Sequence, residues 1–527
     1  SDFCVDLGIN IPTGKDSMSM TQKYPNGDLV YSPGTVIVSA AGEVSDVKKA
    51  VTPVLKNVEN TKVIYVDFSL SNFDLGGSAF AQTLNSLGDK APAVKSAEYV
   101  RKSFNIIQQL INEGLILSGH DVSSGGLITT LLEMCFGAED LGMELLFDVF
   151  ENEYIYNIAF SEKPAIVIQV KDYNKVASIL IENNIEFFIL GDVVESETLN
   201  INYKEETFKF DISDFRDIWY HPSLLFNMDQ IRGQLASERY MNVFEQPLRY
   251  KFGQVFTGKL SSYGLKADRR EPSGVKAAII REKGVNGDRE MAYALYLAGF
   301  DVKDIHTTDL MSGRENLEDV NMIVFVGGFS NSDVLGSAKG WAGALKYNPK
   351  ARAAIYNFYK RHDTLSLGVC NGCQLMVELG LVYPEMDIQP RMLHNDSRKF
   401  ESEFINVNIP INNSVMLAPL AGSRLGVWVA HGEGKFDLSL PENNYSIPMK
   451  YSYSEYPGNP NGSSYSAAAI CSKDGRHLAM MPHIERAFLP WQWPHYTREN
   501  DEIAPWLLAF ASAREWVENK TKKRKRQ

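Results

Sequence analysis

The stretch LGVCNGCQLMVELGL, residues 367–381, decides the fold of the second half of the chain. An apolar strand ends at Cys370, and a helical pattern of apolar residues follows at once. Gly368 and Gly372 stand two residues before and two residues after the cysteine, so the chain can turn sharply from strand to helix. This pattern is typical of a nucleophile elbow, which presents its thiol at the N-terminus of a helix.

Two simpler interpretations of Cys370 stay open from the residues alone. It can be a buried structural cysteine, or half of a redox or metal-binding Cys370-x-x-Cys373 pair. A closed zinc site needs four ligands, and the chain has no second C-x-x-C pair to supply them. The following helix would favour a thiolate, and the amide of Asn371 would donate to an oxyanion, so the elbow pattern favours a nucleophile.

A strand–helix rhythm surrounds the elbow. The predicted strands are VKAAIIR (275–281), MIVFVGG (322–328) and TLSLGVC (364–370), and the predicted helix is REMAYALYLAGF (289–300). Short apolar strands joined by helices and ended by Gly-rich turns indicate a doubly wound, mainly parallel sheet with its site at the carboxyl ends of the strands. We therefore predict an α/β domain over 274–519.

The first part of the chain, residues 1–225, is predicted to form a separate α+β domain. The predicted strands are TVIVSAAGEV (35–44), KVIYVDFS (62–69) and PAIVIQV (164–170), and an amphipathic helix is predicted over 97–114, closed by Gly114. A polar, helix-prone stretch (221–245) follows. Residues 226–273 are predicted to be a linker, since most of this segment has little periodicity and several Gly, Pro and charged residues. The basic run 520–527 is interpreted as a solvated tail rather than a nucleic-acid arm.

Composition excludes several classes of function. The 527 residues carry 53 Lys and Arg against 65 Asp and Glu, a net charge of −12, which argues against nucleic-acid and membrane-surface partners. Five cysteines in so long a chain do not resemble a disulfide framework and suggest a reducing, cytoplasmic setting. No apolar run is long enough for a membrane span. The chain opens without a methionine and runs at once into a dense motif, so we expect a piece of a longer protein.

A thiolate nucleophile needs a base, and the strongest candidate lies in HLAMMPHIERAF (477–488). The run LAMM is predicted as a strand that ends at Pro482. In an extended chain His483 and Glu485 would then project from the same side, where a carboxylate can orient an imidazole. A His-x-Glu pair alone is more often a surface pair, but its position after a cysteine elbow in one domain favours a catalytic role.

The loop GGFSNSD (327–333) closes another predicted strand. A second oxyanion amide is expected there, from around Gly328 or Phe329. The alternative is an ordinary strand-to-helix turn.

These motifs carry a resemblance. GVCNGCQ, the Gly-Gly-Phe-Ser loop with DVLGSAKGWA after it, HGEGKF (431–436) and MPHIERAF together resemble the class I glutamine amidotransferase domain of the formylglycinamide ribonucleotide amidotransferase family, in its large, single-chain form. The resemblance implies that Cys370 is the glutaminase nucleophile, His483 its base and Glu485 the orienting carboxylate. Gln374 falls where such domains contact the substrate.

The resemblance continues upstream. IPTGKDSMSM (11–20), LGGSAFAQ (75–82) and SGHDVSSGGL (118–127) resemble the second half of the synthetase region of the same family, which is similar to aminoimidazole ribonucleotide synthetase. GKDS is not a P-loop, because Ile9 and Asp16 stand where that motif needs Gly and Ser or Thr. From composition, the Asp and Ser residues before the Gly-Gly turn suit helix capping better than a metal-bound phosphate. The resemblance instead implies that Asp121 is a magnesium ligand and Ser123 a nucleotide contact.

Two departures from the family pattern stand out. The other magnesium carboxylates, the nucleotide loop and a catalytic histidine belong to an N-terminal half that has no counterpart here, so the ATP and magnesium site is expected to be incomplete. Asn331-Ser332 also stands where the family has a Tyr-Gly type step.

The resemblance implies ATP-dependent conversion of formylglycinamide ribonucleotide to the amidine with ammonia from glutamine, in purine biosynthesis. The expected partners are glutamine, ATP and formylglycinamide ribonucleotide, together with the N-terminal half of the same enzyme. Two alternatives remain: a glutamine-dependent synthetase such as those making CTP or GMP, and a catalytically silent scaffold. GKDS and HDVSSGG argue against the first, and the intact set of Cys370, His483 and Glu485 argues against the second.

Overall fold

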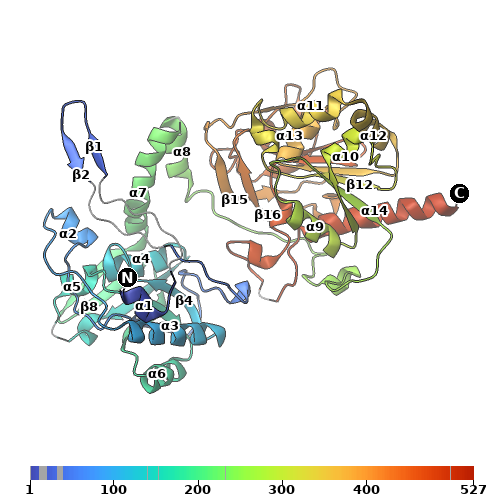
Figure 1. The fold of residues 1–527 in the computed structure, drawn as a ribbon. Helices are drawn as coiled ribbons and strands as arrows, with labels where there is room; N and C mark the ends of the chain where they lie inside the picture. Colours follow the sequence, from blue (N-terminus) through green and yellow to red (C-terminus); the bar gives the residue numbers. More distant parts are fainter. Residues whose placement is uncertain are drawn as a thin grey trace. The chain divides into compact units, whose positions relative to one another are not determined.

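The computed structural model describes residues 2–10, 20–31, 39–138, 140–151, 153–231, 233–498 and 500–526, with side chains described as far as residue 522. The chain divides into two compact units, Ser1–His221 and Pro222–Gln527, and each is described by itself (Figure 1).

A seven-stranded sheet forms the centre of the first unit. In sheet order its strands are β4 (Ile116–Asp121), β6 (Ala165–Val170), β3 (Lys62–Asp67), β7 (Phe187–Glu195), β5 (Leu141–Leu146), β8 (Thr198–Tyr203) and β9 (Glu206–Asp211). Neighbouring strands are antiparallel except β5 and β8, which are parallel. A mainly antiparallel sheet together with helices in the same unit confirms the predicted α+β class.

Both faces of this sheet are covered, because alternate side chains of its central strand enter different apolar clusters. On β3, Ile64 and Val66 pack with α3 (Ala97–Asn112) and α6 (Tyr173–Glu182), whereas Val63 and Tyr65 pack on the opposite face. The opposite face is covered by α4 (Gly126–Phe136) and α5 (Ile155–Phe160). The other described elements that precede residue 100 are α1 (Asp2–Leu7), β1 (Thr21–Lys23), β2 (Leu29–Tyr31), a 3₁₀ turn (Val47–Lys49) and α2 (Ala79–Thr83).

The structure confirms the strands predicted at 62–69 and 164–170 as β3 and β6, and the amphipathic helix as α3. The strand predicted at 35–44 is wrong where it can be checked: residues 39–44 are exposed and have no strand partner, and 35–38 lie outside the described residues. Apolar content alone predicted this strand, but a strand forms only beside another strand. Residues 11–19 of the motif at 11–20 also lie outside the described residues.

The helix-prone stretch predicted at 221–245 is confirmed by α7 (Ile212–Gln230) and α8 (Gly233–Asn242). Part of the predicted linker packs within the second unit: Phe252 stacks on Tyr496 and meets Trp493 edge-on, and Phe256 is buried in the core. The domain boundaries given above stay predictions.

The second unit is built on a nine-stranded sheet. In sheet order its strands are β11 (Asp301–His306), β10 (Lys276–Arg281), β12 (Met322–Phe325), β13 (Leu365–Val369), β20 (His477–Met480), β19 (Ala467–Cys471), β18 (Ser446–Tyr451), β15 (Glu401–Asn408) and β16 (Arg424–His431). The first five are parallel, as predicted, and the last four continue the sheet in antiparallel fashion. A small ribbon pairs β14 (Arg391–Leu393) with β17 (Lys435–Asp437).

Helices lie on both faces of the parallel half (Figure 1). On one face α10 (Thr307–Ser312), α11 (Lys339–Tyr347), α12 (Pro349–Lys360) and α13 (Asn371–Glu378) pack on one another. On the other, α9 (Asp288–Leu297) packs against α14 (Leu507–Arg526). Strands covered on both faces are buried throughout, as β12 and β13 are, and this confirms the doubly wound architecture.

Among the described residues, no helix combines the length and the apolar character needed to cross a bilayer. All five cysteines are free thiols.

Candidate active site

The elbow at Cys370 is a strained turn between β13 and α13. Cys370 has a φ of +51°, which a residue with a side chain rarely adopts. The small neighbours are required by packing: a Cβ on Gly368 would lie 2.5 Å from the carbonyl oxygen of Gly372, and a Cβ on Gly372 would overlap the carbonyl oxygen of Phe325. The strained backbone and the two glycines are therefore parts of one device that fixes the position of the sulfur.

The two cysteines of the C-x-x-C sequence have different environments. The Sγ atom of Cys370 lies 3.5 Å from the carbonyl oxygen of Ala430, and the residue is 5% exposed. Cys373 is fully buried, and burial together with the neighbouring Cys370 raises the pKa of its thiol well above the ordinary value. The described residues hold no cluster of three or more metal-ligating side chains, so nothing in them supports the metal interpretation of this pair.

His483 and Glu485 meet, but not as the sequence predicted. The chain after β20 is not extended: Ile484–Arg486 forms a single 3₁₀ turn, because the N–H of Arg486 donates to the carbonyl of His483 at 3.2 Å. The turn still brings the two side chains together, with Nδ1 of His483 2.6 Å from Oε1 of Glu485. The N–H of His483 donates to the carbonyl of Trp428 at 2.8 Å, which ties this turn to β16.

The charge of His483 is controlled by its neighbours. Burial alone lowers the pKa of His483, but the carboxylate of Glu485 and the nearby Cys370 thiol outweigh burial and raise this pKa to about 9. Since Nδ1 faces Glu485, the proton-exchanging atom is Nε2. Nε2 is buried and makes no hydrogen bond within the described part of the chain, so it is available to a thiol or a substrate.

The Gly-rich loop 327–330 lies beside both side chains. A Cβ on Gly327 would lie 2.8 Å from Cε1 of His483 and 3.3 Å from Cβ of Cys370. The N–H of Phe329 donates to the carbonyl of Gly284 at 2.9 Å, so this amide is already engaged. Of the two amides considered for the oxyanion, the amide of Gly328 is the one that this contact leaves free.

The next residues of the loop adopt an unusual conformation. Asn331, Ser332 and Asp333 all have left-handed φ values, +53°, +56° and +49°. The resemblance implies a Tyr-Gly type step at Asn331-Ser332, and a glycine in place of Ser332 would adopt this conformation without a Cβ clash. The departure noted in the sequence therefore places Ser332 in a strained position.

Gln374 links the elbow helix α13 to the segment 431–436 by hydrogen bonds. Its Nε2 donates to the carbonyl of Glu433 at 2.8 Å, and its Oε1 accepts from Nδ2 of Asn371 at 3.0 Å. Oδ1 of Asn371 in turn accepts from the N–H of Ser330 at 3.2 Å. The substrate contact implied for Gln374 stays a prediction, since both ends of its amide bind the protein.

His431 was given no role from the sequence, although it lies beside the pair. It is 2% exposed, its Nδ1 lies 3.2 Å from Oδ1 of Asn395, and its Nε2 makes no hydrogen bond within the described residues. Burial and the neighbouring His483 lower the pKa of His431 to about 3, so it stays neutral. The signal in the sequence was a histidine inside a Gly-rich turn, HGEGKF.

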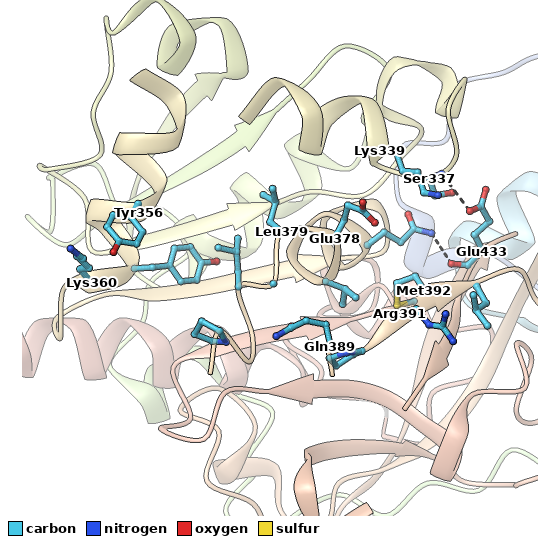
Figure 2. A pocket seen from close by; sticks show the side chains of 18 residues that line it. Ser337, Lys339, Tyr356, Lys360, Glu378, Leu379, Gln389, Arg391, Met392 and Glu433 are labelled. Atoms are coloured by element: carbon cyan, nitrogen blue, oxygen red, sulfur yellow. Dashed lines mark hydrogen bonds between the residues drawn. The ribbon is translucent and has the colours of Figure 1, made fainter. Parts of the chain in front are cut away.

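A pocket of about 850 Å³ runs along α13 and the 379–393 loop (Figure 2). Glu433 lies at one end, where it accepts hydrogen bonds from Ser337 and Gln374, and Tyr356 and Lys360 lie at the other. Neither the candidate nucleophile nor the candidate base lines this pocket. The thiol chemistry therefore belongs to the cluster at the carboxyl ends of β13 and β20, not to this cavity.

Asp121, the predicted magnesium ligand, ends β4 in the first unit. Its side chain is 74% exposed and lies 3.3 Å from Nδ1 of His120, which also contacts Glu133 at 3.0 Å. The described residues provide no group of three carboxylate, imidazole or thiol side chains that would hold a metal ion. By themselves these residues do not fit a magnesium site, because magnesium held by one carboxylate keeps most of its water.

The turn after Asp121 is not capped as composition suggested. The N-cap of α4 is Gly125, with a φ of +90°, and no side chain caps this helix. Instead, Oε1 of Glu162 accepts from the N–H of Gly125 at 3.0 Å and from the N–H of Ala79 at 2.8 Å, so it joins the two Gly-rich loops. Ser123, the predicted nucleotide contact, is exposed on this turn. Sequence reasoning missed Glu162, whose two partners lie 83 and 37 residues away.

Three family models match segments of the chain. Residues 274–517 match the family model of the CobB/CobQ-like glutamine amidotransferase domain. Residues 69–204 match the C-terminal domain of AIR synthase related proteins, and residues 1–43 match the PurM_N-like domain of FGAR-AT.

Curated relatives match along almost the whole chain. A probable phosphoribosylformylglycinamidine synthase of Arabidopsis thaliana is 38% identical over 98% of this chain. The chain is a relative of the phosphoribosylformylglycinamidine synthases. The human and Dictyostelium discoideum synthases are 38% and 36% identical over 97% and 98% of this chain. The matches cover 38%, 40% and 42% of the Arabidopsis, human and Dictyostelium synthases, so the chain spans about two fifths of their length.

Proposed function

We propose that this chain supplies the glutaminase of a phosphoribosylformylglycinamidine synthase. The observation that carries the proposal is the elbow: a strained Cys370 at the N-terminus of α13, beside a His483–Glu485 pair at 2.6 Å. A thiol, a base and an orienting carboxylate in this order suit acyl transfer from a carboxamide.

In the proposed reaction, the proton of the Cys370 thiol resides on His483 as an imidazolium, and the thiolate sulfur attacks the side-chain carboxamide carbon of glutamine. A tetrahedral oxyanion forms, and the N–H groups of Asn371 and Gly328 are the proposed donors to it. The C–N bond then breaks, and His483 returns its proton to the leaving ammonia. Water attacks the resulting thioester, which yields glutamate and the free thiol. Glu485 holds the imidazole in the tautomer that this cycle needs and stabilises the imidazolium.

We propose that the ammonia is used in the ATP-dependent conversion of formylglycinamide ribonucleotide to the amidine, in purine biosynthesis. The relatives carry the name of this synthase, which supports the proposal. Asp121 and Ser123 are proposed as one side of the nucleotide site. The rest of that site is proposed to come from a further part of the enzyme, and a cytoplasmic location is proposed with it.

The test is affinity labelling with a glutamine analogue that carries a thiol-alkylating diazoketone. We expect about one label per chain at Cys370, located by peptide mass mapping, and none in Cys370→Ala. Glutamate release should fall by about 10³-fold or more in Cys370→Ala. Cys373→Ala is the matched control, because its buried thiol should leave the rate within about threefold of the parent. Equal loss in both variants would instead favour a paired-cysteine site.

A further inference from the structure

A hydrogen bond links the loop after β10 to the turn Ile484–Arg486. Nη2 of Arg486 donates to Oδ1 of Asn286 at 2.8 Å. The backbone N–H of Asn286 donates to the carbonyl of Gly327 at 2.9 Å. Asn286 therefore contacts both the turn that carries the orienting carboxylate and the Gly-rich loop that carries the free amide.

The carboxylate of Glu485 is buried and only half paired. The residue is 1% exposed, its Oε1 faces His483, and its Oε2 makes no hydrogen bond within the described residues. A buried charge is costly unless nearby groups compensate it. The described surroundings must therefore supply a positive potential close to this carboxylate.

The N-terminus of α9 and the Arg486 guanidinium supply that potential. Gly287, with a φ of +80°, is the N-cap of α9, and no side chain caps this helix. A Cβ on Gly287 would lie 3.5 Å from Oε1 of Glu485 and 3.4 Å from Nη2 of Arg486. The positive end of a helix dipole stabilises a carboxylate at this range, and α9 packs against the Ile484–Arg486 turn.

We propose that Asn286 and Arg486 form a clamp that holds the N-terminus of α9 against Glu485, and that Asn286 is a positioning residue for glutamine hydrolysis. The inference rests on the proposed glutaminase function. The clamp has two effects: it keeps Glu485 aimed at His483, and the backbone N–H of Asn286 holds the Gly327 carbonyl of the Gly-rich loop. Asn286 itself touches no reacting atom.

The clamp acts on the imidazolium of His483. The titratable groups that face His483 are the Cys370 thiol, the Glu485 carboxylate on its own turn and the neutral His431 at the end of β16. Arg486 and Glu290 lie one layer further, with 4.0 Å between Nε and Oε1. Because Glu485 raises the pKa of His483, a misplaced Glu485 lowers it, and the imidazolium is then lost at a lower pH.

The test compares Asn286→Ala, Asn286→Asp and Arg486→Met in the full chain. Asn286→Ala should lower kcat for glutamine about tenfold while KM changes less than about twofold. Its upper pH limit for activity should fall below that of the parent. Asn286→Asp keeps an acceptor oxygen for Arg486, so it should recover to within about threefold of the parent. Arg486→Met should behave like Asn286→Ala.

Asp304→Asn is the matched control, because it removes a similar exposed arginine pair, Asp304 with Arg281 at 2.6 Å, from the same sheet. It should change neither rate nor pH limit. The titration of His483, followed by NMR of ¹³Cε1-labelled histidine and assigned with His483→Gln, tests the clamp without activity. An unshifted titration in Asn286→Ala, or no recovery in Asn286→Asp, overturns the clamp. A parent chain that hydrolyses no glutamine overturns the proposed function instead, while the NMR titration still decides the clamp.

Discussion

At the scale of single residues, the candidate site is governed by the pairing of charges rather than by exposure. Two buried histidines lie side by side with opposite behaviour: the pKa of His483 is raised to about 9, whereas that of His431 is lowered to about 3. Burial lowers the pKa of both histidines, but only His483 has a carboxylate hydrogen-bonded to a ring nitrogen. The hydrogen-bonded carboxylate is therefore the reason that His483 is protonated while the neighbouring His431 stays neutral.

This pairing predicts the pH dependence of glutamine hydrolysis. Because the pKa of His483 lies at about 9, its imidazolium persists below that pH and is lost as the pH rises through it. The rate of ammonia release, which needs this proton, should fall above pH 9. The stabilising contribution of the pair should be full below the ordinary histidine pKa of about 6.5 and should be lost through the same upper range.

Glu485→Gln removes the largest influence that raises this pKa, so its upper pH limit should shift downward. His483→Ala should cost more activity than Glu485→Gln, because the carboxylate only orients and stabilises the imidazole. Steady-state rates from pH 6 to 10 measure both effects. Glu485→Gln with the parent rate and the parent limit would remove Glu485 from the mechanism.

At the scale of elements, the loop after β12 is coupled to the geometry of the elbow at Cys370. Its first part is pinned to the loop after β10 through the amides of Asn286 and Phe329. Its second part, Asn331 to Asp333, is held in three successive left-handed conformations. The strain in the second part lies next to Ser330, whose N–H binds the elbow residue Asn371, so loop geometry and oxyanion geometry are coupled.

This strain predicts a stabilising substitution, Ser332→Gly. A left-handed residue with a Cβ costs about 1–2 kcal/mol, and glycine costs about 0.5–1 kcal/mol in chain entropy, so the net gain should be roughly 0.5–1 kcal/mol. Urea unfolding of the second unit measures the gain. Ser332→Ala is the control, since it keeps the Cβ and should gain nothing. If alanine stabilises as much as glycine, the backbone of Ser332 is not strained.

At the scale of the whole molecule, the two compact units differ in how much of a proposed site each one contains. The second unit brings the proposed nucleophile, base and orienting carboxylate together at one sheet edge. In the first unit, Asp121 stands without the further ligands that a magnesium site needs among the described residues.

We therefore predict that the chain by itself hydrolyses glutamine slowly and makes no amidine, even with ammonia and ATP. Free ammonia would be wasted, so a coupled glutaminase is expected to accelerate only when the acceptor site is engaged. Mass spectrometry of the ribonucleotide product tests this with the purified chain. Addition of the N-terminal portion of a relative should restore product. Amidine made by the chain alone would contradict the prediction of an incomplete nucleotide site.

The sequence by itself determined the elements whose causes are local. The elbow at Cys370 could be predicted because a sharp strand-to-helix turn needs small residues at fixed offsets, and these are Gly368 and Gly372. The parallel strands and α3 followed from apolar periodicity in the same way.

Only the tertiary structure decided which distant groups meet at the site. It replaced an extended His483–Glu485 segment with a 3₁₀ turn and engaged the Phe329 amide on Gly284. It also brought Ala430 to the thiol and His431 to His483 from the antiparallel half of the sheet. Apart from the 3₁₀ turn, these contacts join residues that lie far apart in the chain. Their approach is fixed by strand order and by the packing of loops on one sheet edge, which no local pattern of residues encodes.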